Sequence, residues 1–217
     1  MIKHKPAVIG SAILLVICMY LYFPYPDNQL IDATATFMSF PVRNQNGLVM
    51  LGILESILFI LAMLFLVIGL GKYQFRTILI VILLYTFLPR YLLMVYQDTF
   101  ASGISAISYD GNGRCEFEDV SEALLEGTCS LMLQNHSKEP VSFELEFLDS
   151  NHLEEGVRME SLMNVAGPYR ITVDAKQSTL IDLKEILDVS TISGHIFNGS
   201  SNGVHIRLTE GDKSRIL

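Results

Sequence analysis

The stretch that decides the fold is Leu48–Leu70, which reads LVMLGILESILFILAMLFLVIGL and carries a single charge, Glu55. Two further apolar runs flank it in the sequence. Ala7–Phe23 has no charge, and Thr77–Tyr96 has one, Arg90. A helix needs roughly 20 mostly apolar residues to cross the hydrocarbon core of a membrane, so we expect three transmembrane helices, over about 7–23, 48–70 and 77–96.

The first of these runs also has features of a secretory signal, because Lys3 and Lys5 precede it. No site with small residues, of the kind that signal peptidase needs, follows Phe23. Cys18 lacks the preceding small residue that lipoprotein processing needs. We therefore expect the run to remain in the protein as a membrane span.

The orientation of the spans follows from the basic residues near their ends, which collect on the cytoplasmic side. These residues are Lys3, Lys5, Lys72 and Arg76. We therefore expect the N-terminus and the turn 71–76 to be cytoplasmic, with 24–47 and everything after residue 97 outside. Within 24–47, the segment Leu30–Phe40 is apolar enough to lie on the outer leaflet, and it also fits an ordinary surface loop.

Glu55 and Arg90 are the two charges inside the expected second and third spans. A short turn makes these spans an antiparallel hairpin, and counting residues from its midpoint puts the two charges at nearly the same depth. Because an unpaired charge is costly in hydrocarbon, we expect an intramembrane ion pair. The pair would fix the register of the hairpin. A contact with another membrane subunit and a proton or ion pathway are the alternatives.

Charge divides the chain into two halves. Residues 1–97 contain six Lys or Arg and three Asp or Glu, whereas residues 98–217 contain nine and twenty. Such asymmetry indicates two different environments. We expect a membrane region over 1–97 and an extracytoplasmic domain over 98–217. The acidic second half argues against nucleic acid as a partner, since that affinity depends on cations that meet phosphates.

The second half has the period-two alternation of half-buried strands, as in Val141–Phe147 (VSFELEF). Several such segments with turn signals between them predict an all-β sandwich. The other expected strands are 129–134, 169–174 and 179–183, followed by a last hairpin of 194–197 with 204–208.

The succession of Cys129–Gln134, an Asn-containing turn and Val141–Phe147 resembles the immunoglobulin-like modules of bacterial envelope proteins. The resemblance covers roughly residues 127–210 and is one of fold only, without a specific motif. It implies a β-sandwich with a binding or spacer role. A fold of this kind does not by itself determine a function.

Cys115 and Cys129 both fall in the half expected outside, where disulfides persist. A bond between them would close a loop of about 15 residues, worth roughly 3 kcal/mol in the loop-entropy account. Two free thiols are the alternative. The spacing of these cysteines fits neither a zinc site nor a redox CxxC motif.

The segment that follows Ser108 resembles an EF-hand calcium loop with a helix after it. Its oxygen-bearing residues would be Asp110, Asn112, Glu116 and Asp119. Ser108 replaces the usual first Asp, and Asp119 replaces the longer Glu. The alternative is that Asp110–Gly113 simply forms a turn.

The remaining polar residues give no catalytic pattern. The histidines His136, His152, His195 and His205 are scattered, so we expect surface or strand residues rather than ligands. Two triplets, Asn135–Ser137 and Asn198–Ser200, match the N-glycosylation acceptor and also fit turns.

Nothing in the sequence matches a nucleophile elbow, a Walker loop or an HExxH motif, so we expect no enzymatic activity. We expect an integral membrane protein of a bacterial cell envelope that presents a β-sandwich for partner binding. The alternative is an accessory or sensor subunit of a membrane transport or signalling complex. The expected partners are the lipid bilayer and a membrane or envelope protein, with calcium as the one candidate cofactor.

Overall fold

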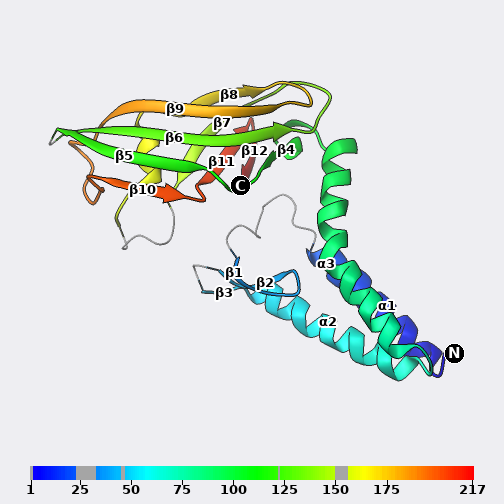
Figure 1. Ribbon diagram of the computed structural model, residues 1–217. Helices are drawn as coiled ribbons and strands as arrows, with labels where there is room; N and C mark the ends of the chain where they lie inside the picture. The colour runs from blue at the N-terminus through cyan, green and yellow to red at the C-terminus, as the bar shows by residue number, and fades with distance from the viewer. Residues whose placement is uncertain (1, 23–32, 45–46, 122, 150–155) are drawn as a thin grey trace. The chain divides into compact units, whose positions relative to one another are not determined.

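The computed structural model describes residues 2–22, 33–44, 47–121, 123–149 and 156–217, without the side chains of Tyr22, Ala33, Thr34, Asn44 and Arg90. The chain divides into two compact units (Figure 1). The first holds the described residues up to Met94, and the second holds Val95–Leu217. Each unit is described separately below.

Three helices form most of the first unit: α1 (Lys5–Tyr22), α2 (Met50–Gly69) and α3 (Gln74–Thr99). Among the described residues, α2 and α3 are long and apolar enough to cross a membrane, judged by length and composition. The helix α1 is apolar but shorter. The structure therefore contains two candidate spans, one fewer than the sequence predicts.

Helices α1 and α2 pack closely. The hydroxyl of Ser11 donates a hydrogen bond to the carbonyl oxygen of Ala62 at 2.7 Å. Closer to the start of α1 and at the end of α2, a Cβ at Gly69 would lie only 2.5 Å from Cγ2 of Val8. Small residues such as Gly69, Ser11 and Ala62 let the two helix backbones approach closely, as small residues do in membrane helix pairs.

The segment before α2 forms a small antiparallel sheet of β1 (Ala33–Phe37), β2 (Phe40–Asn44) and β3 (Gly47–Leu48). The sequence indicated no regular structure here, so this sheet is a correction to the expected loop. The physical reason is the burial of Phe40. Its ring lies 5.9 Å from the ring of Phe59 and 6.2 Å from that of Tyr85, centroid to centroid. Residues 23–32, the first part of that loop, lie outside the described residues.

Two antiparallel sheets make up the second unit. One contains β4 (Ile107–Tyr109), β5 (Arg114–Ser121), β6 (Leu124–Asn135), β9 (Ser178–Asp188) and β10 (Gly199–Asn202). The other has the order β12 (Lys213–Ile216), β11 (His205–Glu210), β7 (Val141–Leu148), β8 (Tyr169–Val173). Two short 3-10 helices, η1 (Gly103–Ala106) and η2 (Glu160–Val165), complete this unit.

Strand β6 organises the first of these sheets. Its residues 124–130 pair with β5, and residues 133–135 pair with β4. Residues 124–134 pair with β9. Since a strand has only two edges, β4 and β5 share one edge of β6, and β9 occupies the other.

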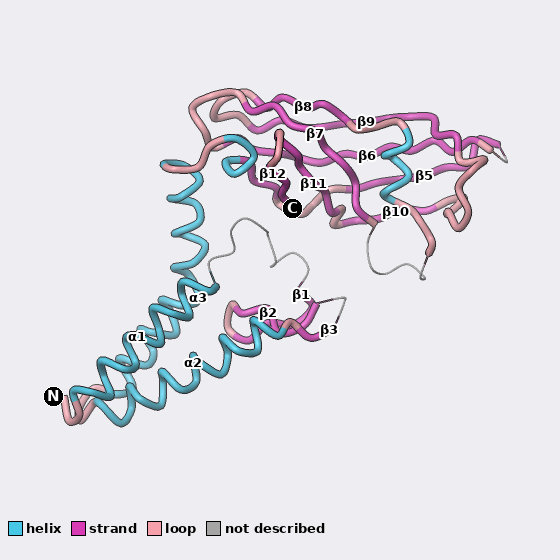
Figure 2. Tube along the Cα trace, turned by 180° about the vertical axis from the view of Figure 1, so that it is seen from behind, coloured by secondary structure: helices cyan, strands magenta, loops and turns pink. Residues whose placement is uncertain are grey.

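The two sheets form two layers, which Figure 2 shows from behind. A single hydrophobic core lies between them, with contributions from β4, β5, β6 and β9 on one side and β7, β8 and β11 on the other. The alternation read from the sequence accounts for this burial. In β7, for example, Val141, Phe143, Leu145 and Phe147 are buried, and the residues between them are more exposed. The described chain thus combines helices with antiparallel β-sheets.

The expected last hairpin is wrong. Residues 194–197 do not form a strand, and 199–202 form β10, which pairs with β5. The strand β11 lies in the opposite sheet, between β7 and β12. The chain therefore passes from one sheet to the other at residues 203–204, between β10 and β11. Period-two alternation identifies a strand but does not say which neighbour it chooses.

Candidate functional site

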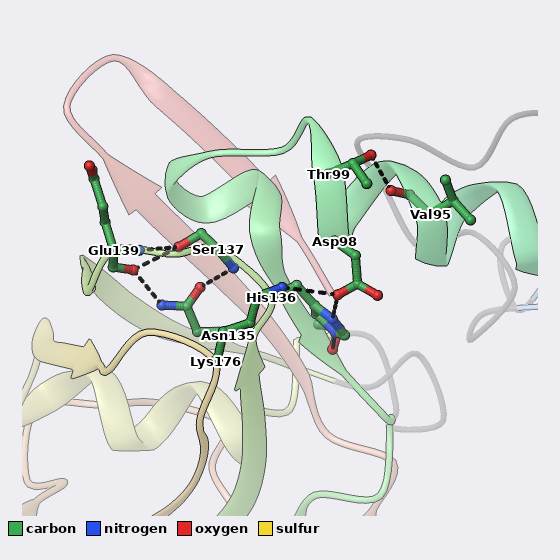
Figure 3. A network of polar contacts seen from close by, with 9 residues as sticks. Val95, Asp98, Thr99, Asn135, His136, Ser137, Glu139 and Lys176 are labelled. Carbon is green, nitrogen blue, oxygen red and sulfur yellow. Dashed lines mark hydrogen bonds and ion pairs between the residues drawn. The ribbon is translucent and has the colours of Figure 1, made fainter.

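A network of polar side chains lies where α3 ends (Figure 3). Its foundation is Asn135, the last residue of β6, whose side chain is 1% exposed. The Asn135 amide donates hydrogen bonds to the carbonyl oxygens of Glu139 (2.8 Å) and Val173 (2.9 Å). Its oxygen accepts one from the backbone N–H of Ser137 (2.8 Å). Two of these bonds fix the turn between β6 and β7, and the third ties the turn to the end of β8.

His136 follows Asn135 and connects three elements. Its Nδ1 lies 2.9 Å from Oδ1 of Asp98, in the last turn of α3. Its Nε2 lies 2.8 Å from the hydroxyl oxygen of Ser108 on β4. The ammonium of Lys176 reaches the same Asp98 oxygen at 3.4 Å. A histidine with hydrogen on Nδ1 donates to Asp98 and accepts from Ser108, which satisfies both ring nitrogens.

The chain that follows α3 is held from the C-terminal strands as well. The Arg215 side chain, 4% exposed, donates hydrogen bonds from Nη1 to the carbonyl oxygens of Ile104 (3.0 Å) and Ile107 (2.6 Å). The Glu210 carboxylate accepts one from the backbone N–H of Ile104 at 3.0 Å. A buried guanidinium needs such partners, because a charge without them is costly away from water. These contacts hold η1 and the start of β4, the two elements that follow α3 along the chain.

A surface cavity of about 370 Å³ opens beside this network. Its lining includes Asp98, Ser102, Ser137, Glu139 and Glu210, and it is mostly polar. Ser108 and His136 are not among the lining residues. The cavity therefore meets the Asp98–His136–Ser108 contacts only through Asp98, whereas Ser137 and Glu139 of the network line it directly.

The order Asp98, His136, Ser108 matches the pairing of a hydrolase triad, in which histidine binds a carboxylate through Nδ1 and a nucleophile through Nε2. Two observations set it apart from such a site. The Asp98 side chain is 46% exposed and shares its oxygen with Lys176, which weakens its support for a charged imidazole. The neighbouring cavity also does not reach the Ser108 hydroxyl. The arrangement is therefore suited to holding α3 and β4 together.

The expected calcium ligands are not brought together. Asp110 accepts hydrogen bonds from the backbone N–H and the side-chain amide of Asn112, both at 3.0 Å, and these bonds hold its pKa below the usual range. Glu116 pairs with Arg114. The segment around Glu116 and Asp119 is strand β5 and leads into a hairpin with β6 instead of a helix. Residues three apart in a strand point to opposite faces. Within the described residues, no group of three or more His, Cys, Asp or Glu could hold a metal ion.

The side chain of Tyr109 binds the backbone of the turn at residues 110–113. Its hydroxyl oxygen accepts a hydrogen bond from the backbone N–H of Gly113 at 2.7 Å, and a Cβ at Gly113 would collide with that oxygen. Burial raises the pKa of Tyr109 to about 12. Burial also raises the pKa of Tyr169 to about 12, and its hydroxyl donates to the carbonyl oxygen of Met163. Residues 110–113 thus form a turn anchored in the core.

Cys115 and Cys129 form a disulfide in the structure. They lie directly opposite each other in the β5–β6 pairing, and both are fully buried in the core. Their burial follows from the alternation, since Cys115 and Phe117 share the inner face of β5. The bond therefore links two adjacent strands of one sheet. Cys18, the one other cysteine, is free and buried in the first unit.

Glu55 lies in α2 with its side chain 2% exposed. Its Oε1 is buried and has no hydrogen-bond partner in the described part of the chain. Arg90, its expected partner, lies on α3, but its side chain is outside what the structure describes. The ion pair between them remains a prediction. The burial of Glu55 is the feature that makes a partner necessary.

Sequence reasoning missed Asp98, Ser108 and Lys176, and it treated His136 as a surface residue. These residues are up to 78 positions apart and meet only because β4 and β9 pair with the same end of β6. The one local signal was the Asn-His-Ser turn. The structure also shows that Asn135, in the first glycosylation triplet, has its amide buried and bonded, whereas Asn198 in the second triplet is exposed.

Comparisons with protein-family models, curated proteins and solved structures find no match to this chain.

Proposed function

We propose that the protein is an integral membrane protein of a cell envelope, with three spans over about 7–23, 48–70 and 77–96. The N-terminus is cytoplasmic, and residues 98–217 form an extracytoplasmic, immunoglobulin-like β-sandwich. The length and composition of α2 and α3 support the spans. The basic residues Lys3, Lys5, Lys72 and Arg76 support the orientation. The disulfide between Cys115 and Cys129 supports an oxidising location for the sandwich.

In this proposal the function of the protein is to present its β-domain to a protein partner at the membrane surface. The observation that carries it is the direct continuity of α3 with that domain. Residues from Val95 onward belong to the second unit, and Asp98, still within α3, bonds to His136. Along the chain, three residues, 100–102, lie between the end of α3 and η1 of the second unit, whose net charge is acidic. In this proposal the β-domain is therefore close to the membrane, and its partner is a protein at the membrane surface.

Crosslinking in native membranes, followed by affinity purification and mass spectrometry, tests this function. We expect a protein partner whose crosslinks map to residues in 98–217. Crosslinks that map only to residues 1–94 would show that the helices bind the partner, and this would contradict a binding role for the β-domain. Recovery of the chain alone, or only with a second copy of itself, would contradict the proposal that the β-domain binds a different protein.

A second candidate is an accessory or sensor subunit, in which the state of the β-domain is passed to a partner in the membrane through α3. The contact of His136 with Asp98 in the last turn of α3 favours it, because this contact ties the β-domain to the helix that would carry the signal. Here the partner would crosslink to the helices as well. His136→Ala would then alter the partner's activity without removing it from the complex.

The proposal includes no enzymatic activity, despite the triad-like order of Asp98, His136 and Ser108. A fluorophosphonate probe tests this directly, since it forms a covalent bond with an activated serine hydroxyl. We expect no label on Ser108, and the same result with His136→Ala. Labelling of Ser108 that disappears in His136→Ala would show an activated nucleophile and overturn this part of the proposal.

A further inference from the structure

Within the described part of the chain, strand β9 is a long edge strand that pairs along one side only, with β6. It pairs with β6 along all eleven of its residues without a register shift. Just beyond its two ends, Asn135 donates to the carbonyl oxygen of Gln177, and Val189 donates to that of Ala123. Because antiparallel strands bond through alternate residues, the odd-numbered residues of β9 bond to β6. The backbone groups of its even-numbered residues therefore face away from the sheet.

The even-numbered residues on this free edge have a distinctive order. Leu180 and Ile186 are 59% and 53% exposed, which is high for large apolar side chains. Between them lie the exposed charges Asp182 and Lys184, and the Lys184 ammonium already lies 2.7 Å from Oε1 of Glu126 on β6, so pairing across two copies has to share or replace this contact. Proteins commonly protect an edge strand by making it short, bulged or interrupted by proline. β9 has none of these three devices, and the protection that its edge does have is charge, from Asp182 and Lys184.

The sequence of β9 is complementary to itself in antiparallel orientation. With a two-fold axis at Leu183, Asp182 of one copy lies opposite Lys184 of the other, and the reverse pair forms as well. Leu180 then lies opposite Ile186, also twice. Opposite charges and apolar pairs at directly facing positions stabilise a sheet, whereas like charges destabilise it. An axis at residue 182 or 184 would instead place Asp182 or Lys184 opposite itself.

We propose that β9 is a homodimer interface, in which the β9 strands of two copies pair antiparallel about Leu183 and join their sheets into one continuous sheet. The even-numbered residues supply the backbone hydrogen bonds, since theirs are the groups directed away from β6. The same patch serves both copies, as in other two-fold symmetric interfaces. The inference concerns the β-domain of the proposed function but does not depend on a partner of another kind.

The test uses the full chain in its membrane. In the proposed register, residue 183 faces itself in a non-hydrogen-bonded pair, where Cα atoms lie about 4.5 Å apart, within the reach of a disulfide. Under mild oxidation, Leu183→Cys should therefore form a crosslinked dimer. Ser214→Cys is the matched control, because it lies exposed on β12, an edge strand of the other sheet. Equal crosslinking of the two variants, or none at all, overturns the proposal.

Charge exchange then tests the register. In the Leu183→Cys background, Asp182→Lys places Lys opposite Lys in both pairs and should reduce the crosslinked fraction roughly tenfold. The double change Asp182→Lys with Lys184→Asp reverses both pairs and should restore it. A double variant no better than the single one contradicts the register. Residue 183 lies directly opposite Cys129 in the β6–β9 pairing, so a dimer counts only where mass spectrometry finds the Cys115–Cys129 disulfide intact and the new bond between two copies of residue 183. Crosslinks to other proteins in the same membranes report separately on the proposed function.

Discussion

Nδ1 of His136 lies 2.9 Å from Oδ1 of Asp98, so the residue after β6 is bonded to the last turn of α3. Both residues belong to the second unit, and α3 is long and apolar enough to cross a membrane, judged by length and composition. Asn135, Arg215 and Glu210 hold the surrounding backbone in place. The end of α3 is thus the best-supported polar site in the second unit.

Replacing His136 by Ala should loosen the end of α3. The substitution removes the imidazole, so Asp98 and Ser108 each lose their hydrogen bond to it. The bond to the partly exposed Asp98 carboxylate is worth about 1 kcal/mol. We expect faster hydrogen exchange over 95–99 and 107–109, measured by mass spectrometry on the detergent-solubilised protein. Lys176→Ala is the control, because its longer, exposed contact with Asp98 should contribute less. Equal exchange rates in wild type and His136→Ala would show that the His136–Asp98 contact does not stabilise the end of α3.

Asn135→Ala should be among the most destabilising polar substitutions in the β-domain. It leaves the N–H of Ser137 and two carbonyl groups without their partner, at a cost of about 2–3 kcal/mol. Asn198→Ala is the matched control, since Asn198 is exposed and accepts one hydrogen bond, from the N–H of Asp119. Thermal unfolding followed by circular dichroism should show a larger fall in Tm for Asn135→Ala. A similar fall for both variants contradicts the role given to the buried amide.

The β-domain should lose stability in alkali. An unfolded tyrosine ionises near pH 10, whereas burial raises the pKa of Tyr109 and Tyr169 to about 12. Folding therefore favours the neutral phenols, and their contribution is present below pH 10 and lost as the pH rises to about 12. We expect the Tm to fall across this interval, together with tyrosinate absorbance that appears on unfolding. Tyr109→Phe should reduce this pH dependence, and an unchanged dependence in that variant would contradict the assignment.

The expected pair of Glu55 and Arg90 is tested by exchanging its charges. Glu55→Arg and Arg90→Glu should each reduce the amount of folded protein in the membrane, because each leaves two like charges in an apolar bundle. The double exchange should restore it. Glu55→Gln, which removes the charge and keeps the shape, should be milder than Glu55→Arg. A double variant as defective as the single ones means that these residues are not partners.

The sequence predicts those features that depend on local periodicity. Apolar runs locate α2 and α3, and alternation locates β7 and the buried face that includes Phe143 and Leu145. Pairing choices are not local, so the placement of β10 against β5 could not be predicted. The same holds for the polar site. Asp98, Ser108 and His136 become neighbours only through the register of β4 on β6, which no spacing in the sequence encodes.

Two other differences have physical causes that a single segment does not reveal. The residues before α2 form β1 and β2 because Phe40 finds an aromatic pocket made by Phe59 and Tyr85, which come from two different helices. The calcium-loop pattern failed because the alternating oxygen donors also fit a hairpin. Burial of Cys115 and Phe117 on one face decided in favour of strand β5.

The central claim is that the β-domain lies outside a membrane whose inner side faces the turn between α2 and α3. The most direct measurement is labelling of intact cells with a membrane-impermeant maleimide. Two exposed lysines supply the matched positions, Lys72 in that turn and Lys213 at the start of β12. We predict that Lys213→Cys is labelled in intact cells and that Lys72→Cys is labelled only after permeabilisation. Labelling of Lys72→Cys in intact cells, or protection of Lys213→Cys, would contradict the account.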